Sequence, residues 1–235
     1  MNKTNFVFKK KKKSGFTLAE VLLVITIIGI IASYTIPPLV QNIQDMQLRT
    51  AWKSNYSDFS RAAQALASDN DNDLSKVFGS VLDHDNFRDP FLPYLNYIQK
   101  CDAGSATTGN TGCWHAANTW YYLSGAMWGA SCSTFSRLVL SNGSLVFFEH
   151  KNTTCTGTNT PNDDNCGLMR IDINGFKKPN MIGKDIFSIN LLKNGSILPQ
   201  GVQGDFWYNK PQYGCDLTAD PAAQGYNCSV EVLYE

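Results

Sequence analysis

The chain has 235 residues, 43% of them apolar, and its 20 Lys and Arg balance its 20 Asp and Glu to a formal charge of zero. This length and apolar content allow one or two domains with a sizeable core, and they exclude collagen-like, low-complexity and wholly disordered chains. The neutral total also argues against a globally basic nucleic-acid-binding protein.

The neutral charge is an average over two unlike regions. Residues 1–15 contain six lysines and no acid, so the rest of the chain has 14 basic against 20 acidic side chains, a net charge of −6. The charge pattern therefore divides the chain at Gly15.

An apolar run follows this division directly. Residues 16–36 read FTLAEVLLVITIIGIIASYTI and carry one charge, Glu20. As a helix this run would be about 31 Å long, enough to cross a hydrocarbon core. The preceding lysines favour a cytoplasmic N-terminus, with everything after residue 37 outside. A secretory signal peptide fits poorly, because the run is long and continues into a helical pattern. A plain membrane anchor leaves Glu20 unexplained, since an acid in such a helix costs about 2.5–3.5 kcal/mol.

The stretch KKKKKSGFTLAEVLLVITIIGIIASYTIP resembles the class III signal of type IV pilins and type II secretion pseudopilins. In that family a basic leader ends in Gly, cleavage falls between Gly and Phe, and a Glu is the fifth residue of the mature chain. Gly15, Phe16 and Glu20 match these three positions.

The resemblance implies that a prepilin peptidase cuts after Gly15 and N-methylates Phe16. It also implies that Glu20 pairs with the Phe16 amine, commonly of a neighbouring subunit. Cleavage creates a cationic amine at the start of the apolar run, and a carboxylate four residues along is an available counter-charge in low dielectric. Loss of Glu20 is therefore expected to harm assembly more than insertion.

On this resemblance the chain is a structural subunit of a type II secretion pseudopilus or a type IV pilus. The expected partners are the prepilin peptidase, other pilin or pseudopilin subunits and an inner-membrane assembly platform, with no nucleic acid. The expected location is the bacterial inner membrane, crossed once, with the C-terminal domain periplasmic or extracellular and part of a fibre after assembly. A minor pilin acting as an adhesin or as a DNA- or substrate-binding tip subunit is the alternative, and an ordinary anchor without processing at Gly15 is a third.

Pro37 and Pro38 follow the apolar run, where they predict a kink or local melting of the helix, or its plain end. Beyond them, steps of three and four residues predict an amphipathic helix over 39–67. Its apolar stripe is Leu48, Trp52, Tyr56, Phe59, Ala63 and Leu66, and its polar face is Gln47, Lys53, Asn55, Asp58 and Arg61. The predicted layout is a leader (1–15), a transmembrane and assembly helix (16–37), its amphipathic outer half (38–68) and a globular domain (69–235).

Two hairpins are predicted in the globular domain. Asn142-Gly143 and Asn194-Gly195 each separate two strand-like segments, and Asn-Gly favours a type I′ turn. The segment GLMRIDING between them reads as a further strand. An antiparallel sheet of about four strands against the amphipathic helix gives an α+β, pilin-like fold, in agreement with the resemblance.

All seven cysteines follow residue 100, in a loop-rich region that suits an oxidising compartment. Short-range pairing gives Cys101 with Cys113, Cys155 with Cys166 and Cys215 with Cys228, leaving Cys132 free. The sequence leaves the other connectivities open. Residues 86–131 are rich in aromatics and predict an insertion held by disulfides, with its tryptophans either buried or forming a ligand surface.

Asp172, Asn174 and, further on, Asp185 supply hard oxygen ligands around a tight turn, so calcium is a possible ligand although no cofactor is required. The resemblance points the same way, because major pseudopilins bind calcium in a C-terminal loop. A structural turn between two strands is the alternative. The sequence contains no GxSxG, HExxH or P-loop motif, so we expect no enzyme.

Overall fold

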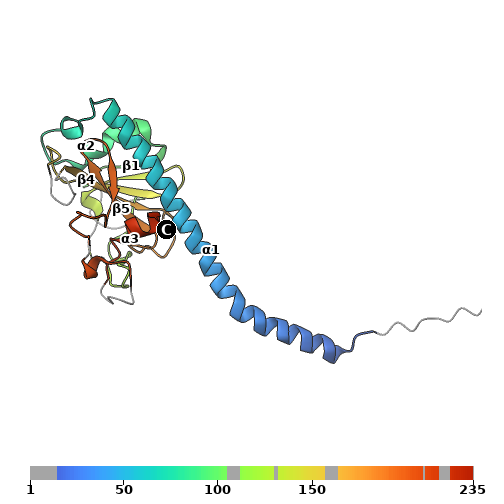
Figure 1. Ribbon diagram of the computed structural model, residues 1–235. Coiled ribbons are helices and arrows are strands. Elements are labelled where there is room, and N and C mark those ends of the chain that lie inside the picture. The colour runs from blue at the N-terminus through green and yellow to red at the C-terminus, as the bar shows by residue number, and fades with distance from the viewer. Residues whose placement is uncertain are drawn as a thin grey trace, which may run out of the picture. The chain divides into compact units, whose positions relative to one another are not determined.

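The computed structural model describes residues 15–104, 112–129, 132–156, 164–208, 210–216 and 223–234, and most of the predicted leader lies outside these ranges. The chain divides into two compact units, residues 1–45 and 46–235. The elements run in the order α1 (Leu18–Ser68), η1 (Leu74–Lys76), α2 (His84–Arg88), η2 (Asp89–Tyr94), β1 (Tyr97–Cys101), η3 (Cys132–Thr134), β2 (Ser136–Leu140), β3 (Leu145–His150), β4 (Asn165–Asp172), β5 (Ile186–Leu192), β6 (Ile197–Pro199), η4 (Pro211–Tyr213) and α3 (Cys228–Tyr234) (Figure 1).

Helix α1 contains both the apolar run and the amphipathic segment in 51 residues. It ends where the DNDND run begins, because Asp71 and Asn72 adopt positive φ and the N–H of Asn72 turns back to the carbonyl of Ala67. Asp and Asn tolerate this left-handed conformation better than most residues. The long N-terminal helix predicted from the sequence is confirmed.

The outer part of α1 belongs to the same unit as the sheet. Trp52, Phe59, Ala63 and Leu66 of the predicted stripe are buried, and Leu48 and Tyr56 pack against them in part. Asn55, however, was expected on the polar face and is only 2% exposed. Its amide donates to the carbonyl of Ala51 and its oxygen accepts from Asn142, so the β2–β3 turn extends the buried face of the helix.

The sheet has six antiparallel strands in the order β1-β2-β3-β4-β5-β6, a meander in which every strand pairs with its neighbour in sequence. The antiparallel α+β layout is confirmed, and the strands number six where about four were expected. β1 is the strand that no predicted segment covers. It is exposed along most of its length, so it lacks the apolar pattern that predicts a strand.

Both faces of the sheet are covered, and side chains of the central strands alternate between two cores. Val146 and Phe148 face α1 and α2, whereas Leu145 and Phe147 face the aromatic insertion. Burial on both faces explains why residues 138–140 of β2 and residues 145–148 of β3 form continuous apolar runs. Trp114 and Trp120 lie in the second core and are almost fully buried, so the core interpretation of these tryptophans is correct.

The Asn-Gly hairpins occur as predicted, but their turn type was predicted wrongly. In the first, Gly143 has φ of 88° whereas Asn142 stays outside the positive-φ region, and the N–H of Leu140 donates to the carbonyl of Ser144. The loop therefore has three residues, a type I turn closed by a left-handed Gly. The Asn142 side chain accepts from the N–H of Ser144, and Asn194 repeats this bond with Ser196.

Candidate processing and assembly site

The Gly15–Phe16 junction lies open at the start of α1. A Cβ added to Gly15 would meet nothing within 4 Å, and Phe16 is 89% exposed. Both residues are therefore accessible in this structure. The cleavage itself, and the methylation of Phe16, stay predictions.

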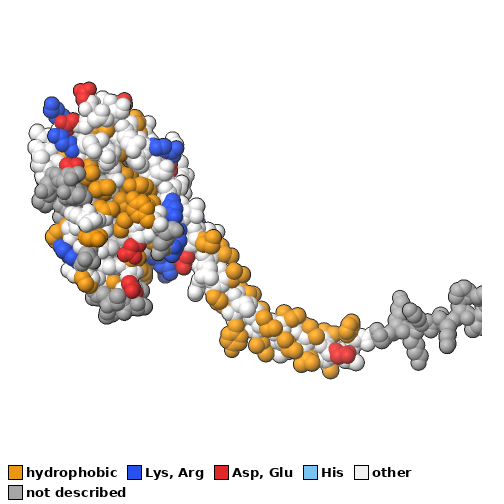
Figure 2. Space-filling view, viewed as in Figure 1, with side chains coloured by type: hydrophobic (Ala, Val, Ile, Leu, Met, Phe, Trp, Pro, Cys, Tyr) orange, Lys and Arg blue, Asp and Glu red, His pale blue; other side chains and the backbone are white. Residues whose placement is uncertain are grey.

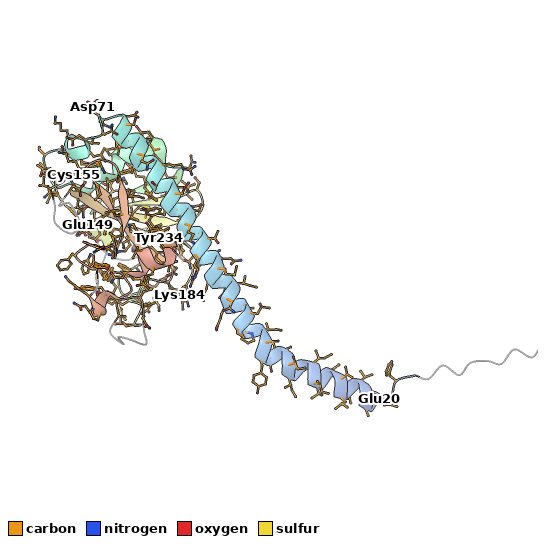
Figure 3. All side chains as sticks on the ribbon, viewed as in Figure 1. Glu20, Asp71, Glu149, Cys155, Lys184 and Tyr234 are labelled. Atoms are coloured by element: carbon orange, nitrogen blue, oxygen red, sulfur yellow. A yellow bond between two sulfur atoms is a disulfide. The ribbon has the colours of Figure 1, made fainter. Side chains whose placement is uncertain are left out.

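Glu20 lies in the first turn of α1 (Figure 3). Its carboxylate accepts from the N–H of Thr17 at 2.7 Å and from the Thr17 hydroxyl at 2.8 Å, while the N–H of Glu20 donates to the same hydroxyl at 3.2 Å. This is a reciprocal capping box, which satisfies backbone donors that a helix N-terminus leaves without partners. The capping role of Thr17 was not predicted from the sequence, although the Thr-x-x-Glu spacing is a sufficient signal for it.

The surface that follows Glu20 is apolar and exposed. Val21, Leu23, Ile28 and Ile31 are each about half exposed, and Figure 2 shows apolar side chains covering the visible face of this part of the helix. The hydroxyls of Thr26, Ser33 and Thr35 are satisfied within the helix, where they donate to the carbonyls of Leu22, Ile30 and Ile31. Internal satisfaction of polar groups is what a hydrocarbon environment demands. By length and composition, α1 is the one described helix that could cross a membrane.

Pro37 and Pro38 lie inside α1, and the helix continues through both of them. The predicted helix end and local melting therefore do not occur at this position. Neither proline has an N–H, so the carbonyls of Ser33 and Tyr34 lose their usual helical partners. The kink itself stays a prediction.

A second candidate site, the acidic turn between β4 and β5, brings together the three residues proposed for calcium. Asp172 and Asp185 are both fully buried. The carboxylate of Asp172 accepts from the N–H of Asn174 at 3.1 Å, and its other oxygen lies 2.6 Å from Nε2 of His115. His115 comes from the aromatic insertion, a partner that sequence spacing could not reveal.

Asp185 closes the same turn from the other side. Its two oxygens accept from the N–H groups of Asn180 at 2.7 Å and Met181 at 2.6 Å, and from the side-chain amide of Asn174 at 3.1 Å. Burial raises the pKa of Asp185, and burial together with the nearby charge of Asp185 raises the pKa of Asp172. In the part of the chain that the structure describes, no group of three or more His, Cys, Asp or Glu side chains could hold a metal ion.

Three disulfides join Cys101 to Cys113, Cys155 to Cys166 and Cys215 to Cys228. These are the short-range pairs, and Cys132 is free and buried. Each disulfide closes a loop next to the sheet or α3. The cysteines of this chain therefore serve the folded unit, and an oxidising location suits them.

An open Gly–Phe junction, a capped acid and an exposed apolar surface thus lie together at the start of α1. The family described as the prokaryotic N-terminal methylation motif matches residues 10–35. The chain thus carries the prepilin-type signal of type IV pilins and pseudopilins. No curated protein and no solved structure matches the chain.

Proposed function

We propose that this chain is a precursor that is cut after Gly15, methylated on Phe16 and assembled through α1 into a type II secretion pseudopilus or a type IV pilus. The observation that supports this most directly is the methylation motif over residues 10–35, which leads into a helix whose large apolar side chains from Val21 to Ile31 are about half exposed. Exposed apolar surface of this extent is a membrane- or partner-binding surface.

The assembly step follows from Glu20. In the precursor its carboxylate caps the helix through Thr17. Cleavage places a positive amine on Phe16, next to this cap, and the amine and carboxylate attract each other strongly when subunit packing removes water. Removing one partner leaves a buried charge unpaired, which costs about 3–5 kcal/mol, so assembly requires both partners.

The orientation we propose places the lysine-rich leader in the cytoplasm and residues 46–235 outside. The six lysines before Gly15 support it, because positive residues flanking a membrane helix stay inside. The three disulfides support it as well, since they persist in oxidising compartments. The inner-membrane assembly platform and the prepilin peptidase are the partners that this arrangement requires.

The test is the mass and N-terminal sequence of the full chain extracted from membranes, with and without a co-expressed prepilin peptidase. We expect a product that starts at Phe16 and carries one methyl group on its amine. The matched control is Gly15→Val, which is expected to accumulate uncut and still insert. A wild-type chain that keeps residues 1–15 in the presence of active peptidase would refute the proposal.

We also propose calcium binding at the acidic turn formed by Asp172, Asn174 and Asp185. The side-chain oxygens of Asn174 and Asn180 favour it, because both are buried and neither has a hydrogen-bond donor. Two buried carboxylates beside them provide negative charge, and carboxylate and amide oxygens are the ligands that calcium prefers. Bound calcium would neutralise the repulsion between the two acids.

This second proposal is tested by the melting temperature of the full chain in detergent micelles during a calcium titration. A ligand at 100 times its Kd stabilises the folded state by about 2.7 kcal/mol, so a clear rise is expected. Asp172→Asn is expected to lower the rise, and magnesium at the same concentration serves as the ionic control. An unchanged melting temperature at millimolar calcium would remove calcium from the description of this turn.

A further inference from the structure

Two histidines that are 66 residues apart in sequence meet at the junction between α2 and β3. The backbone N–H of His150 donates to Nδ1 of His84 at 3.0 Å. The backbone N–H of Asp83 donates to Nδ1 of His150 at 3.3 Å. Each ring therefore accepts a hydrogen bond from the other segment's backbone, and the two bonds run in opposite directions.

This arrangement fixes the protonation state of both rings. A ring nitrogen that accepts a hydrogen bond carries no proton, so Nδ1 is unprotonated in His84 and in His150. Nε2 of His150 lies 3.2 Å from the carbonyl of Asn152, so the Nε2–H group donates a hydrogen bond to this carbonyl. Both imidazoles are therefore neutral in the folded chain, and a proton added at either Nδ1 would face a backbone N–H.

The two bonds hold the entry of α2 against the end of β3. Asp83 is the N-cap of α2 and accepts from the N–H groups of Asp85 and Asn86. In the next turn the ring of Phe87 stacks on the ring of His150, with centroids 5.4 Å apart and planes 6° from parallel. Loss of the imidazole bonds would therefore loosen both the cap and the packing of Phe87.

Some of the charges around the two rings raise the histidine pKa values, and others lower them. Burial lowers the pKa of His84, while Glu149 of β3 (Figure 3), Asp83 and Asp85 raise it and Lys151 lowers it. Burial is also the largest effect on His150 and lowers its pKa.

Further effects on His150 come from its neighbours. The bond to the carbonyl of Asn152 and the charge of Asp83 raise its pKa, whereas the charge of His84 lowers it. For both rings the pKa stays below the ordinary value, because burial outweighs the acids.

We propose that His84 and His150 form an acid-released latch, in which protonation of either imidazole frees the entry of α2 from the end of β3. An opened or unfolded segment takes up a proton near pH 6.5, whereas the closed rings resist it until a lower pH. The latch is therefore fully closed above about pH 6.5, and it opens as the pH falls below this value. For each histidine the ratio of closed to open chains falls up to tenfold per pH unit in this window.

Hydrogen exchange of the full chain in detergent micelles tests the latch, with exchange corrected for the intrinsic effect of pH. Between about pH 7.5 and about pH 5 we expect at least a tenfold loss of protection in peptides that contain Asp83 and His150. Peptides from β4 and β5 are expected to keep theirs. Unchanged protection at His150 across this range would overturn the proposal.

His84→Asn and His150→Asn separate titration from packing. Asn places an acceptor oxygen close to the position of Nδ1 and does not titrate, so each variant is expected to reduce the pH response and the double variant to abolish it. His84 is only partly buried, so His84→Asn keeps the test available where His150→Asn disturbs the fold. His115→Asn is the matched control, because His115 bonds Asp172 and lies outside the latch. A pH response that survives in the double variant would refute the proposal.

Discussion

Residues 18–45 and the unit formed by residues 46–235 use apolar side chains in opposite ways. In the first, large apolar residues such as Ile28 and Ile31 remain more than half exposed, whereas in the second Trp52, Phe59 and Trp120 are completely buried. The second unit is also fastened by three disulfides and covered on both faces of its sheet. The comparison teaches that one region stabilises its own fold, while the other leaves exposed the apolar surface that we propose contacts lipid or other subunits.

The largest expected effect breaks the first region without touching the second. Glu20→Ala removes the cap formed with Thr17. It also removes the counter-charge that we propose for the Phe16 amine. We expect normal membrane insertion and at least a tenfold fall in the amount recovered in sheared fibres, because an unpaired buried charge costs about 3–5 kcal/mol. Glu20→Gln retains an acceptor for the cap and lacks the charge, so it is expected to assemble as poorly. Normal fibre content for both variants would contradict the charge-pair mechanism.

Phe59→Ala and Ile28→Ala test the comparison most directly. Phe59 is fully buried, so its truncation is expected to lower the free energy of unfolding of the sheet unit by about 3–5 kcal/mol. Ile28 is 59% exposed, and its truncation is expected to change this quantity by less than about 0.5 kcal/mol. Tryptophan fluorescence during denaturant unfolding in micelles is the measurement, because all five tryptophans follow residue 45. Equal losses would mean that the regions are not independent.

The two Asn-Gly hairpins allow a smaller, matched test within the second unit. Gly143→Ala places a side chain at φ of 88° in open space and is expected to cost about 1 kcal/mol. Gly195→Ala has nearly the same backbone, yet its Cβ would overlap Ala67 of α1. The overlap adds about 1–3 kcal/mol. The difference between the two melting temperatures measures how tightly the β5–β6 turn packs on the helix, and a difference of zero would disprove that contact.

The smallest effect concerns Asp205, which is buried and accepts from the N–H of Gly201 at 2.8 Å. Burial raises the pKa of Asp205 to about 6. The contribution of Asp205 to the free energy of unfolding is therefore favourable below about pH 4 and is lost as the pH rises through about 6. Asp205→Asn keeps an acceptor for Gly201 and is expected to be about 1–2 kcal/mol more stable than the wild type at pH 7, with little difference at pH 4. Chemical denaturation at the two pH values measures this, and a pH-independent difference would exclude the raised pKa.

Local chemistry made part of this structure predictable from the sequence. The apolar run and the steps of three and four residues predicted α1, and Asn142-Gly143 and Asn194-Gly195 located two of the turns. The candidate site was equally local, since Gly15, Phe16 and Glu20 lie within six positions and match the family motif. These features depend on residues that are close together in the sequence. Periodicity and motif spacing therefore predict them.

Contacts between distant residues account for what was missed. Arg88 is fully buried and bonded to Asp85, Asp89 and Asp102, an arrangement that requires the fold to bring β1 next to α2. Burial of Asn55 depends in the same way on a turn 87 residues further along the chain. Such partners leave no periodic signal, so the sequence assigned these polar residues to the surface or passed over them.

The indole N–H of Trp52 donates to the carbonyl of Ser229, the residue after Cys228, and the ring stacks on Phe187 of β5 with centroids 4.7 Å apart. This places an anchor near the start of the buried part of α1, on elements from the far end of the chain. Tension applied along α1 is therefore passed at Trp52 to the central sheet and to α3. The disulfide between Cys215 and Cys228 then shares that load covalently with the loop before α3. A force applied along α1 therefore reaches the cross-linked part of the domain before it reaches the turn at residue 69. We expect the sheet to stay packed on the outer part of α1 under such a force.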